Sequence, residues 1–169
     1  MDIQKYKNIF LDRDGIVNDV IIRGKVVSSP RLLSEFKLRD DFIQFYEKLK
    51  NEKFFYVVTN QPDIKRQLLT TDNLESMHKE LETFTSIKEI VICAHDDDDF
   101  CNCRKPKPGM INNTIKKHKL VRKDCLMIGD SIKDIKAAYS AKINSVLLKT
   151  SYNRHISDCV YVDSLLDLI

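Results

Sequence analysis

The sequence predicts an α/β fold in which a mostly parallel β-sheet carries helices on both of its faces. Short apolar runs alternate with longer segments whose apolar residues recur every three or four positions, which indicates strands alternating with helices. A helix between two strands returns the chain to the same edge of the sheet, so the strands run parallel. No internal repeat or low-complexity linker divides the 169 residues. We therefore expect one doubly wound, Rossmann-like domain over residues 1–169, without a separate cap domain.

Six runs are expected to form the strands of the sheet. The segment Phe54–Val58 is continuously apolar and rich in residues that favour β-structure, as a strand buried on both faces requires. The other five runs are Ile9–Leu11, Glu89–Cys93, Leu126–Ile128, Ser145–Leu148 and Val160–Val162. Outside the sheet, the segment Val20–Val27 predicts a small hairpin over the site, with a tight turn at Arg23-Gly24.

Four segments between the strands are expected to be helices. Two of them show apolar stripes at the spacing i, i+3, i+4, i+7, namely Phe42, Phe45, Tyr46 and Leu49, and then Leu74, Met77, His78 and Leu81. Before the second stripe, Asp72 is the expected N-cap, with Glu75 three residues later as its capping-box partner. We interpret Met77 and His78 as helix-face residues. The other two helices are expected over Met110–His118 and Lys133–Ala141.

The composition gives no support to a nucleic-acid or membrane partner. The chain has 28 basic and 25 acidic residues, a net charge of +3, so its surface carries mixed charge. No apolar stretch approaches the roughly 18 residues that span a bilayer, and the charged N-terminal run does not resemble a signal peptide. We expect a cytoplasmic monomer whose thiols stay reduced, so that clustered cysteines indicate a metal site rather than disulfides.

Polar residues follow four of the expected strands at the point where each strand ends. The first strand is followed by Asp12-Arg13-Asp14-Gly15, and the second by Thr59-Asn60-Gln61. The third leads into Cys93-Ala94-His95, and the fourth into Gly129-Asp130-Ser131, with Asp134 one turn later. In open parallel sheets, sites form at the carboxyl ends of the strands, near the point where the strand order reverses. The sequence therefore predicts an active site at this edge of the sheet.

Three of these carboxylates predict a divalent cation. Asp12 and Asp14 followed by glycine would by themselves be read as a turn, but Asp130 at another strand end favours a site. Acids held together repel one another unless a cation lies among them, and oxygen ligands with open positions suit Mg2+. Thr59 and Lys105 add a hydroxyl and an ammonium group, which suit a phosphoryl group facing the carboxylates.

This set of residues predicts phosphoryl chemistry on a carboxylate. Asp12 can act as the nucleophile and form an aspartyl-phosphate. Asp14 can protonate the leaving oxygen and then activate water. A free aspartic acid titrates near about 3.9, so we expect the environment of Asp14 to raise its pKa.

A second metal site is predicted in the segment that ends in CRKPKPG. Across a spacer of five residues, this segment supplies four ligands that suit tetrahedral zinc, which are Cys93, His95, Cys101 and Cys103. Four protein ligands would make the zinc structural, and the alternative is a set of buried thiols and a solvated histidine. Arg104 and Lys105 follow the last cysteine at once, so holding its sulfur would also place these two cations.

Four stretches of the chain are similar to the four motifs of the haloacid dehalogenase superfamily of phosphohydrolases. They are FLDRDG, VVTN, the lysine of RKPKPG, and IGDSIKD, and they occur in the order of the family between Ile9 and Ala141. The resemblance implies a Mg2+-dependent phosphatase in which Asp12 is the nucleophile. It implies that Asp14 is the acid/base and that its backbone carbonyl also binds the metal.

The same resemblance implies roles for the other motif residues. Thr59 and Lys105 would bind the phosphoryl group, and Asp130 would be a Mg2+ ligand. Gly15 and Asp134 would support the site.

The zinc-binding loop with CRKPKPG resembles one subgroup of that superfamily, which includes D-glycero-D-manno-heptose 1,7-bisphosphate phosphatases and histidinol-phosphate phosphatases. There Arg104, together with Asn60 and Gln61, is expected to bind the substrate. FLDRDGIVN and PGM resemble the heptose enzymes, whereas the short zinc-loop spacer is closer to the histidinol enzymes, and TNQPDIKRQ departs from the heptose pattern. We predict a small phosphomonoester as substrate, with a sugar phosphate such as D-glycero-D-manno-heptose 1,7-bisphosphate ahead of histidinol phosphate.

Two alternatives from other functional classes use comparable residues. A receiver-like signalling domain also places acids, a Thr and a Lys on a doubly wound sheet, but it has no zinc loop and no DxDG after its first strand. A nucleic-acid 3′-end phosphatase would need a basic groove lined with aromatic side chains, and the sequence shows no such stripe. The four acids Asp96–Asp99 are either a solvated loop tip or an acidic rim for a cationic substrate.

Overall fold

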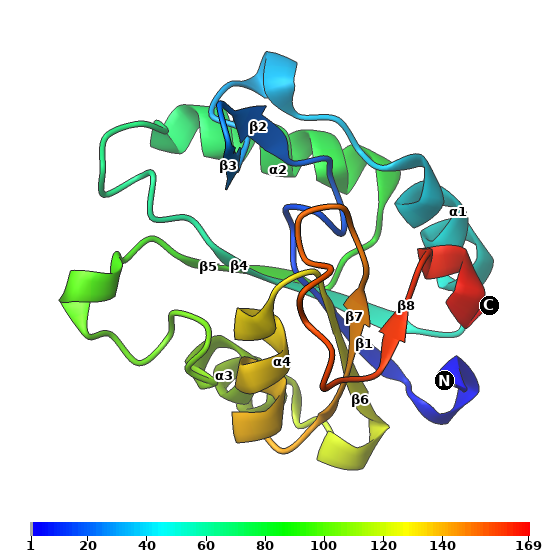
Figure 1. The fold of residues 1–169 in the computed structure, drawn as a ribbon. Coiled ribbons are helices and arrows are strands. Elements are labelled where there is room, and N and C mark those ends of the chain that lie inside the picture. The colour runs from blue at the N-terminus through cyan, green and yellow to red at the C-terminus, as the bar shows by residue number, and fades with distance from the viewer. Residues whose placement is uncertain (1) are drawn as a thin grey trace.

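The structure is a computed structural model that describes residues 2–169. Over this range a six-stranded sheet has the order β5-β4-β1-β6-β7-β8, and its neighbouring strands all pair in parallel (Figure 1). The strands are β1 (Asn8–Leu11), β4 (Phe54–Asn60), β5 (Glu89–Cys93), β6 (Cys125–Gly129), β7 (Asn144–Leu148) and β8 (Tyr161–Val162). The predicted α/β fold and its parallel sheet are therefore confirmed.

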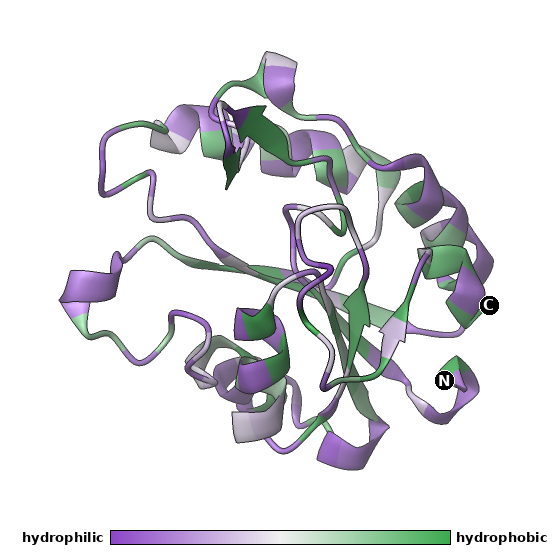
Figure 2. Ribbon diagram, viewed as in Figure 1, coloured by the Kyte–Doolittle hydropathy of each residue, from purple (hydrophilic) through white to green (hydrophobic). Residues whose placement is uncertain are grey.

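Helices cover both faces of the sheet, also as predicted. Helices α1 (Asp40–Leu49) and α2 (Thr71–Phe84) lie on one face, and α3 (Gly109–His118) and α4 (Ile132–Ser140) lie on the other (Figure 1). Strands covered on both sides must be apolar throughout, and Figure 2 shows β1 and β6 as largely hydrophobic. Alternate residues of β1 serve the two cores, because successive side chains point to opposite faces: Ile9 and Leu11 pack with α1 and α2, and Phe10 with α3 and α4.

Outside the sheet, the predicted hairpin is confirmed as strands β2 (Ile21–Arg23) and β3 (Val26–Ser28), which pair antiparallel, but its turn is Gly24-Lys25 rather than the predicted Arg23-Gly24. Short 3-10 helices are found at Ile3–Lys5, Leu33–Glu35, Asp97–Asp99, Arg122–Asp124 and Leu165–Leu168. None of the helices in the described part of the chain is long and apolar enough to cross a bilayer.

The topology places the carboxyl end of β1 at the switch point of the sheet. From β1 the chain builds outward through β4 to β5, then crosses to the other side of β1 and adds β6, β7 and β8. The loops that follow β4 and β6 therefore leave in different directions on either side of β1. A crevice forms at such a point, and the loop after β1, which carries Asp12 and Asp14, opens directly into it.

The N-cap of α2 is Thr70 rather than Asp72, so the predicted cap was wrong. Thr70 has an extended backbone, and its Oγ1 accepts the N–H of Asn73 at 3.2 Å. Asp72 lies inside the first turn, where a carboxylate interacts favourably with the helix dipole, and Glu75 is therefore not in the capping-box position. Both residue types favour the N-cap, so spacing alone could not separate them.

Replacing the observed cap should cost more than replacing the expected one. We expect Thr70→Ala to lower the free energy of unfolding by about 1 kcal/mol, because an N–H at the helix start loses its acceptor. Asp72→Ala should lower it by at most about 0.5 kcal/mol, through the helix dipole alone. Urea unfolding at constant m-value measures both. A larger loss in Asp72→Ala would contradict the assignment of the cap.

Candidate active site and metal centre

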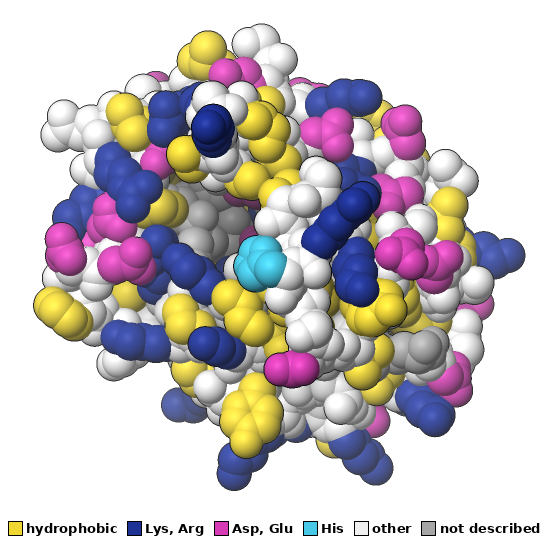
Figure 3. Space-filling model, viewed as in Figure 1, with side chains coloured by type: hydrophobic (Ala, Val, Ile, Leu, Met, Phe, Trp, Pro, Cys, Tyr) yellow, Lys and Arg dark blue, Asp and Glu magenta, His cyan; other side chains and the backbone are white. Residues whose placement is uncertain are grey.

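Several of the predicted site residues line one cleft at the carboxyl end of the sheet. A cavity of about 360 Å³ is lined by residues that follow β1 and β6, by the end of β4 and by the loop before α3; they include Asp12, Asp14, Asn60, Lys105 and Asp134. The hairpin closes another side through Val26, Val27 and Ser28. Figure 3 shows a hollow on this face of the molecule, with basic and acidic side chains on its rim.

Lys105 lies between two carboxylates in the wall of this cleft. Its Nζ is 2.8 Å from Asp12 Oδ1 and 2.6 Å from Asp134 Oδ1, and its side chain is 2% exposed. Burial favours the neutral amine, but the two carboxylates outweigh that effect and raise the pKa of Lys105. The lysine is therefore a permanent positive charge facing the proposed nucleophile. The backbone N–H of Arg13 also donates to Asp12 Oδ1, at 2.7 Å.

Asp12, Asp130 and Asp134 form a carboxylate cluster that fits a divalent cation. One oxygen from each lies within 4.8 Å of the other two. Burial and the neighbouring Asp134 raise the pKa of Asp130 to about 7, and the same two causes raise the pKa of Asp12 well above its ordinary value. Carboxylates crowded in this way are stable as anions when a cation lies among them. Oxygen donors of this kind suit Mg2+.

Two residues in the loop after β7 hold Asp130 in place. Tyr152 Oη donates to Asp130 Oδ2, and Asn153 Nδ2 donates to the Asp130 carbonyl at 2.7 Å and to that of Leu148 at 2.8 Å. Neither residue was expected from the sequence, because TSYNR carries no acid and no motif. The signal that could have found them is positional, since β7 neighbours β6 in the sheet and its following loop must pass close to Asp130.

Gly15 allows the loop after β1 to approach Asp130 closely. Its φ is +87°, in the region that favours glycine. A Cβ at this position would lie 2.0 Å from Asp130 Oδ2 and 2.7 Å from Tyr152 Oη. The glycine of DxDG is therefore required both by backbone conformation and by lack of space.

The pKa of Asp14 is lowered, which corrects the expectation that its environment would raise it. Burial acts to raise this pKa, but the guanidinium of Arg13 and the amides of Asn18 and Gln61 outweigh the effect of burial. Asn18 Nδ2 donates to Asp14 Oδ1 at 3.0 Å, and Gln61 Nε2 donates to Oδ2 at 2.8 Å. A carboxylate that accepts several hydrogen bonds is stabilised in its charged form. In this conformation Asp14 is ionised and ready to accept a proton.

The three polar residues at the end of β4 support the site at different depths. Asn60 bonds the backbone of Lys105 twice, since its Nδ2 donates to the lysine carbonyl and its Oδ1 accepts the lysine N–H, both at 3.0 Å. Thr59 and Gln61 are completely buried, and Gln61 Nε2 donates to Thr59 Oγ1 at 2.9 Å. Gln61 was expected to contact substrate, but it lies behind Asp14. The reason is that its backbone N–H bonds Cys93 O at 2.7 Å and so extends the pairing with β5.

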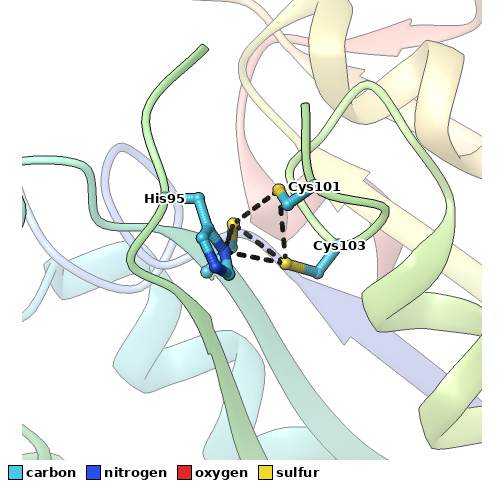
Figure 4. Close-up of side chains that lie close together, drawn as sticks. His95, Cys101 and Cys103 are labelled. Atoms are coloured by element: carbon cyan, nitrogen blue, oxygen red, sulfur yellow. Dashed lines mark hydrogen bonds between the residues drawn. The ribbon is translucent and has the colours of Figure 1, made fainter. Parts of the chain in front are cut away.

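The four predicted zinc ligands come together in the loop that we call the Cys/His loop (residues 93–103). The ligand atoms of Cys93, His95, Cys101 and Cys103 lie within 4.8 Å of one another. The Sγ–Sγ distances are 3.2 to 3.7 Å, and the imidazole faces the sulfurs (Figure 4). Zn–S bonds of about 2.3 Å in a tetrahedron give S–S edges of about 3.8 Å. The donor set therefore fits zinc, with all four positions supplied by the protein.

The acidic run Asp96–Asp99 is mainly occupied in ion pairs. Asp96 accepts from Arg66 Nε at 2.5 Å and Nη2 at 2.8 Å, and Asp97 accepts from Arg104 Nε at 2.7 Å. Asp99 pairs with Lys65. Two of these contacts, Asp96 with Arg66 and Asp99 with Lys65, tie the Cys/His loop to the segment after β4, while the side chain of Asp97 stays 70% exposed.

Residues 4–142 match the family model for haloacid dehalogenase-like hydrolases. The chain therefore belongs to this family, as the four motifs indicated. Within the family, the chain is a phosphoric monoester hydrolase, because its curated relatives are phosphatases.

These relatives are similar over most of the chain. Two are D-glycero-beta-D-manno-heptose-1,7-bisphosphate 7-phosphatases: the Haemophilus influenzae protein is 33% identical over 180 residues, with 96% of this chain and 94% of that protein covered. The protein of Helicobacter pylori strain J99 is 32% identical over 152 residues, with 85% and 83% covered. Among solved structures, the D,D-heptose 1,7-bisphosphate phosphatase from B. bronchiseptica, complexed with magnesium and phosphate, has a TM-score of 0.82 and 26% identity, with 94% and 93% covered.

Two glycines provide a matched test of the crowding at Asp130. Gly15 and Gly24 both have positive φ, +87° and +65°, so alanine strains the backbone at either position. Only at Gly15 does a Cβ clash, since Gly24 has open space around it. We expect Gly15→Ala to lower kcat/KM for p-nitrophenyl phosphate by roughly 100-fold, because the cluster is displaced. Gly24→Ala should stay within about threefold of wild type. Equal losses in steady-state assays would contradict this reading.

Proposed function

We propose that this protein is a Mg2+-dependent phosphatase that hydrolyses a small sugar phosphate through an aspartyl-phosphate intermediate. The observation that carries the proposal is the position of Asp12, whose carboxylate lies on the cleft 2.8 Å from buried Lys105 and beside two further carboxylates. A carboxylate attacks a phosphate dianion readily only where nearby positive charge offsets the repulsion. The relatives support D-glycero-D-manno-heptose 1,7-bisphosphate as the substrate.

In the proposed reaction, a carboxylate oxygen of Asp12 attacks phosphorus and displaces the alcohol. The phosphoryl group is then bound covalently to Asp12. Lys105 stays charged and binds the transferring oxygens. Asp14 is ionised in the structure, so it must take up a proton when the anionic substrate binds beside it, because a nearby negative charge raises the pKa of a carboxyl group. It then gives that proton to the leaving oxygen and regains one from the water that hydrolyses the aspartyl-phosphate. Mg2+, held by Asp12, Asp130 and the Asp14 carbonyl, would supply further charge stabilisation. Asp134 orients Lys105 and accepts the N–H of Ser131 at 3.0 Å.

The charges around the cleft support an anionic sugar over histidinol phosphate. Arg31, Arg104 and Lys133 line the cavity. The nearby acids are already paired, Asp63 with Arg31 at 2.8 Å and Asp97 with Arg104 at 2.7 Å. A cationic leaving group would therefore meet acids whose charge is neutralised. The same pairs neutralise Arg31 and Arg104, so the charge that favours a second phosphate is that of Lys133, for which the described residues show no ion pair.

The covalent mechanism and the substrate class are tested together by a phosphate-release panel with Mg2+. We expect the highest kcat/KM with heptose bisphosphate, above histidinol phosphate, other sugar phosphates and a 3′-phosphorylated oligonucleotide. Asp12→Asn should lose activity by at least about 1,000-fold, because an amide does not replace the nucleophile. Asp40→Asn, at the exposed start of α1, is the control. Selective release from the oligonucleotide would refute the metabolite substrate, and full activity in Asp12→Asn would refute the intermediate.

The zinc assignment is tested by removing one ligand. Wild-type protein should carry about one zinc per chain, and Cys103→Ala should carry almost none, since three ligands bind far more weakly than four. The melting temperature should fall in Cys103→Ala and in wild type treated with a chelator, because metal binding contributes to folding. Cys159→Ala, outside the cluster, should behave as wild type. Zinc-free wild-type protein with unchanged melting in chelator would remove the assignment.

A further inference from the structure

We propose that Arg13 and His78 are positioning residues for Asp14, the carboxyl group that transfers the proton. The inference rests on the proposed function, because it assigns roles within that site. Arg13 stands between the two aspartates of DRDG, and His78 belongs to the apolar stripe of α2. They are 65 positions apart in sequence, yet Arg13 Nη1 lies 3.3 Å from His78 Nε2.

Arg13 is a completely buried cation whose guanidinium donates several hydrogen bonds to the Asp14 carboxylate. Its Nε and Nη2 donate to Asp14 Oδ1 at 3.0 and 2.9 Å, and Nη2 also reaches Oδ2 at 3.2 Å. One face of the guanidinium lies 5.9 Å from the centre of the Phe36 ring. A planar, forked contact sets the orientation of a carboxylate as well as its charge. Lysine cannot reproduce this contact, because its ammonium is a single point charge.

His78 completes the hydrogen bonding of Arg13 from the other side. A guanidinium only donates, so the His78 nitrogen that faces it must be the unprotonated acceptor. Burial and the charge of Arg13 lower the pKa of His78 to about 4, which keeps the imidazole neutral. Leu74, Met77 and Leu81 of the same helix pack into the core. These core contacts fix how α2 packs against the sheet, and His78 on this helix in turn fixes the position of Arg13.

The geometry of Asp14 matters because proton transfer requires close contact. A general acid must lie within about 3 Å of the leaving oxygen, and a misplacement of about 1 Å can cost roughly 100-fold in rate. Asn18 and Gln61 contact the two oxygens from other directions. Within residues 2–169, Arg13 is the only residue whose side chain donates to both carboxylate oxygens, since its Nη2 lies 2.9 Å from Oδ1 and 3.2 Å from Oδ2. It therefore defines the plane of the carboxyl group.

The test compares a substrate that needs the proton with one that does not. A sugar alkoxide leaves slowly unless protonated, whereas nitrophenolate leaves without a proton. Because kcat/KM reports the steps up to alcohol departure, the ratio of the two kcat/KM values isolates proton delivery. For His78→Leu and Arg13→Lys we expect kcat/KM with the sugar phosphate to fall roughly 10- to 100-fold. With p-nitrophenyl phosphate the loss should be less than about threefold.

Two further variants separate positioning from packing. His78→Gln keeps an acceptor for Arg13 and should recover most of the loss. His118→Leu on α3 is the control, since it removes a partly buried histidine that contacts Glu89 Oε2 at 2.7 Å, away from the cleft. In an Asp14→Asn background, adding His78→Leu should cause no further loss, because residues that act through one group are not additive.

Equal losses on both substrates, or losses that add in the Asp14→Asn background, would overturn the proposal. Thermal unfolding identifies variants that do not fold. If His78→Leu does not fold, the proposal is tested with Arg13→Lys and His78→Gln, again by the ratio of kcat/KM with the sugar phosphate to kcat/KM with p-nitrophenyl phosphate. Failure of the proposed function would look different, since wild-type protein would then release phosphate from neither substrate.

Discussion

The site depends on one ammonium group that is buried together with the carboxylates that face it. Lys105 contacts Asp12 and Asp134 within 2.8 Å, and its side chain is almost completely removed from water. An isolated charge at that depth would be strongly destabilising, so the lysine and the acids are tolerated only as a set. The sheet topology makes the set possible. Asp12 and Asp134 follow the adjacent central strands β1 and β6, and Lys105 comes from the loop that crosses between β5 and α3.

Lys105 itself belongs to no helix or strand, so other contacts must hold it. The two hydrogen bonds between Asn60 and the Lys105 backbone fasten it to the end of β4. The Cys/His cluster lies immediately before it in the sequence and fits a metal that would order the loop. An ion pair joins Asp96 of the same loop to Arg66 in the segment after β4, and a second pair, between Asp97 and Arg104, lies within the loop. Such exposed pairs contribute little individually, which suggests that the buried amide contact and the metal ligands carry most of the stabilisation.

The carboxylates of the cleft have opposite electrostatic environments. Asp130 and Asp12 lie among other acids, and burial raises the pKa of each. Asp14 is buried as well, but Arg13 and two amides hold its pKa low. Groups whose environments push their pKa values apart take different chemical roles. The first pair suits metal binding and nucleophilic attack beside a cation, and the third suits accepting a proton from water.

Much of the fold and most of the candidate site could be predicted from the sequence, because the relevant signals are local. A continuous apolar run such as Phe54–Val58 marks a strand buried on both faces. The spacing of Cys93, His95, Cys101 and Cys103 is that of a four-ligand centre, and Asp12 followed at i+2 by a second acid and then Gly15 marks a crowded strand end. Parallel strands share one carboxyl edge, so position along the chain was enough to bring these residues together.

Contacts between segments that are distant in the sequence could not be predicted. The chain alone determined the strands, the acids at their ends and the metal-ligand set, since periodicity and spacing are properties of a single segment. Only the tertiary structure decided that Tyr152 holds Asp130, that Arg13 meets His78, and that Gln61 turns behind Asp14. The same is true of the lowered pKa of Asp14, because a pKa depends on which donors reach the carboxylate. Arg13 and Asn18 are neighbours of Asp14 in the sequence, but only the fold decides that their side chains turn toward its carboxylate and that Gln61 joins them.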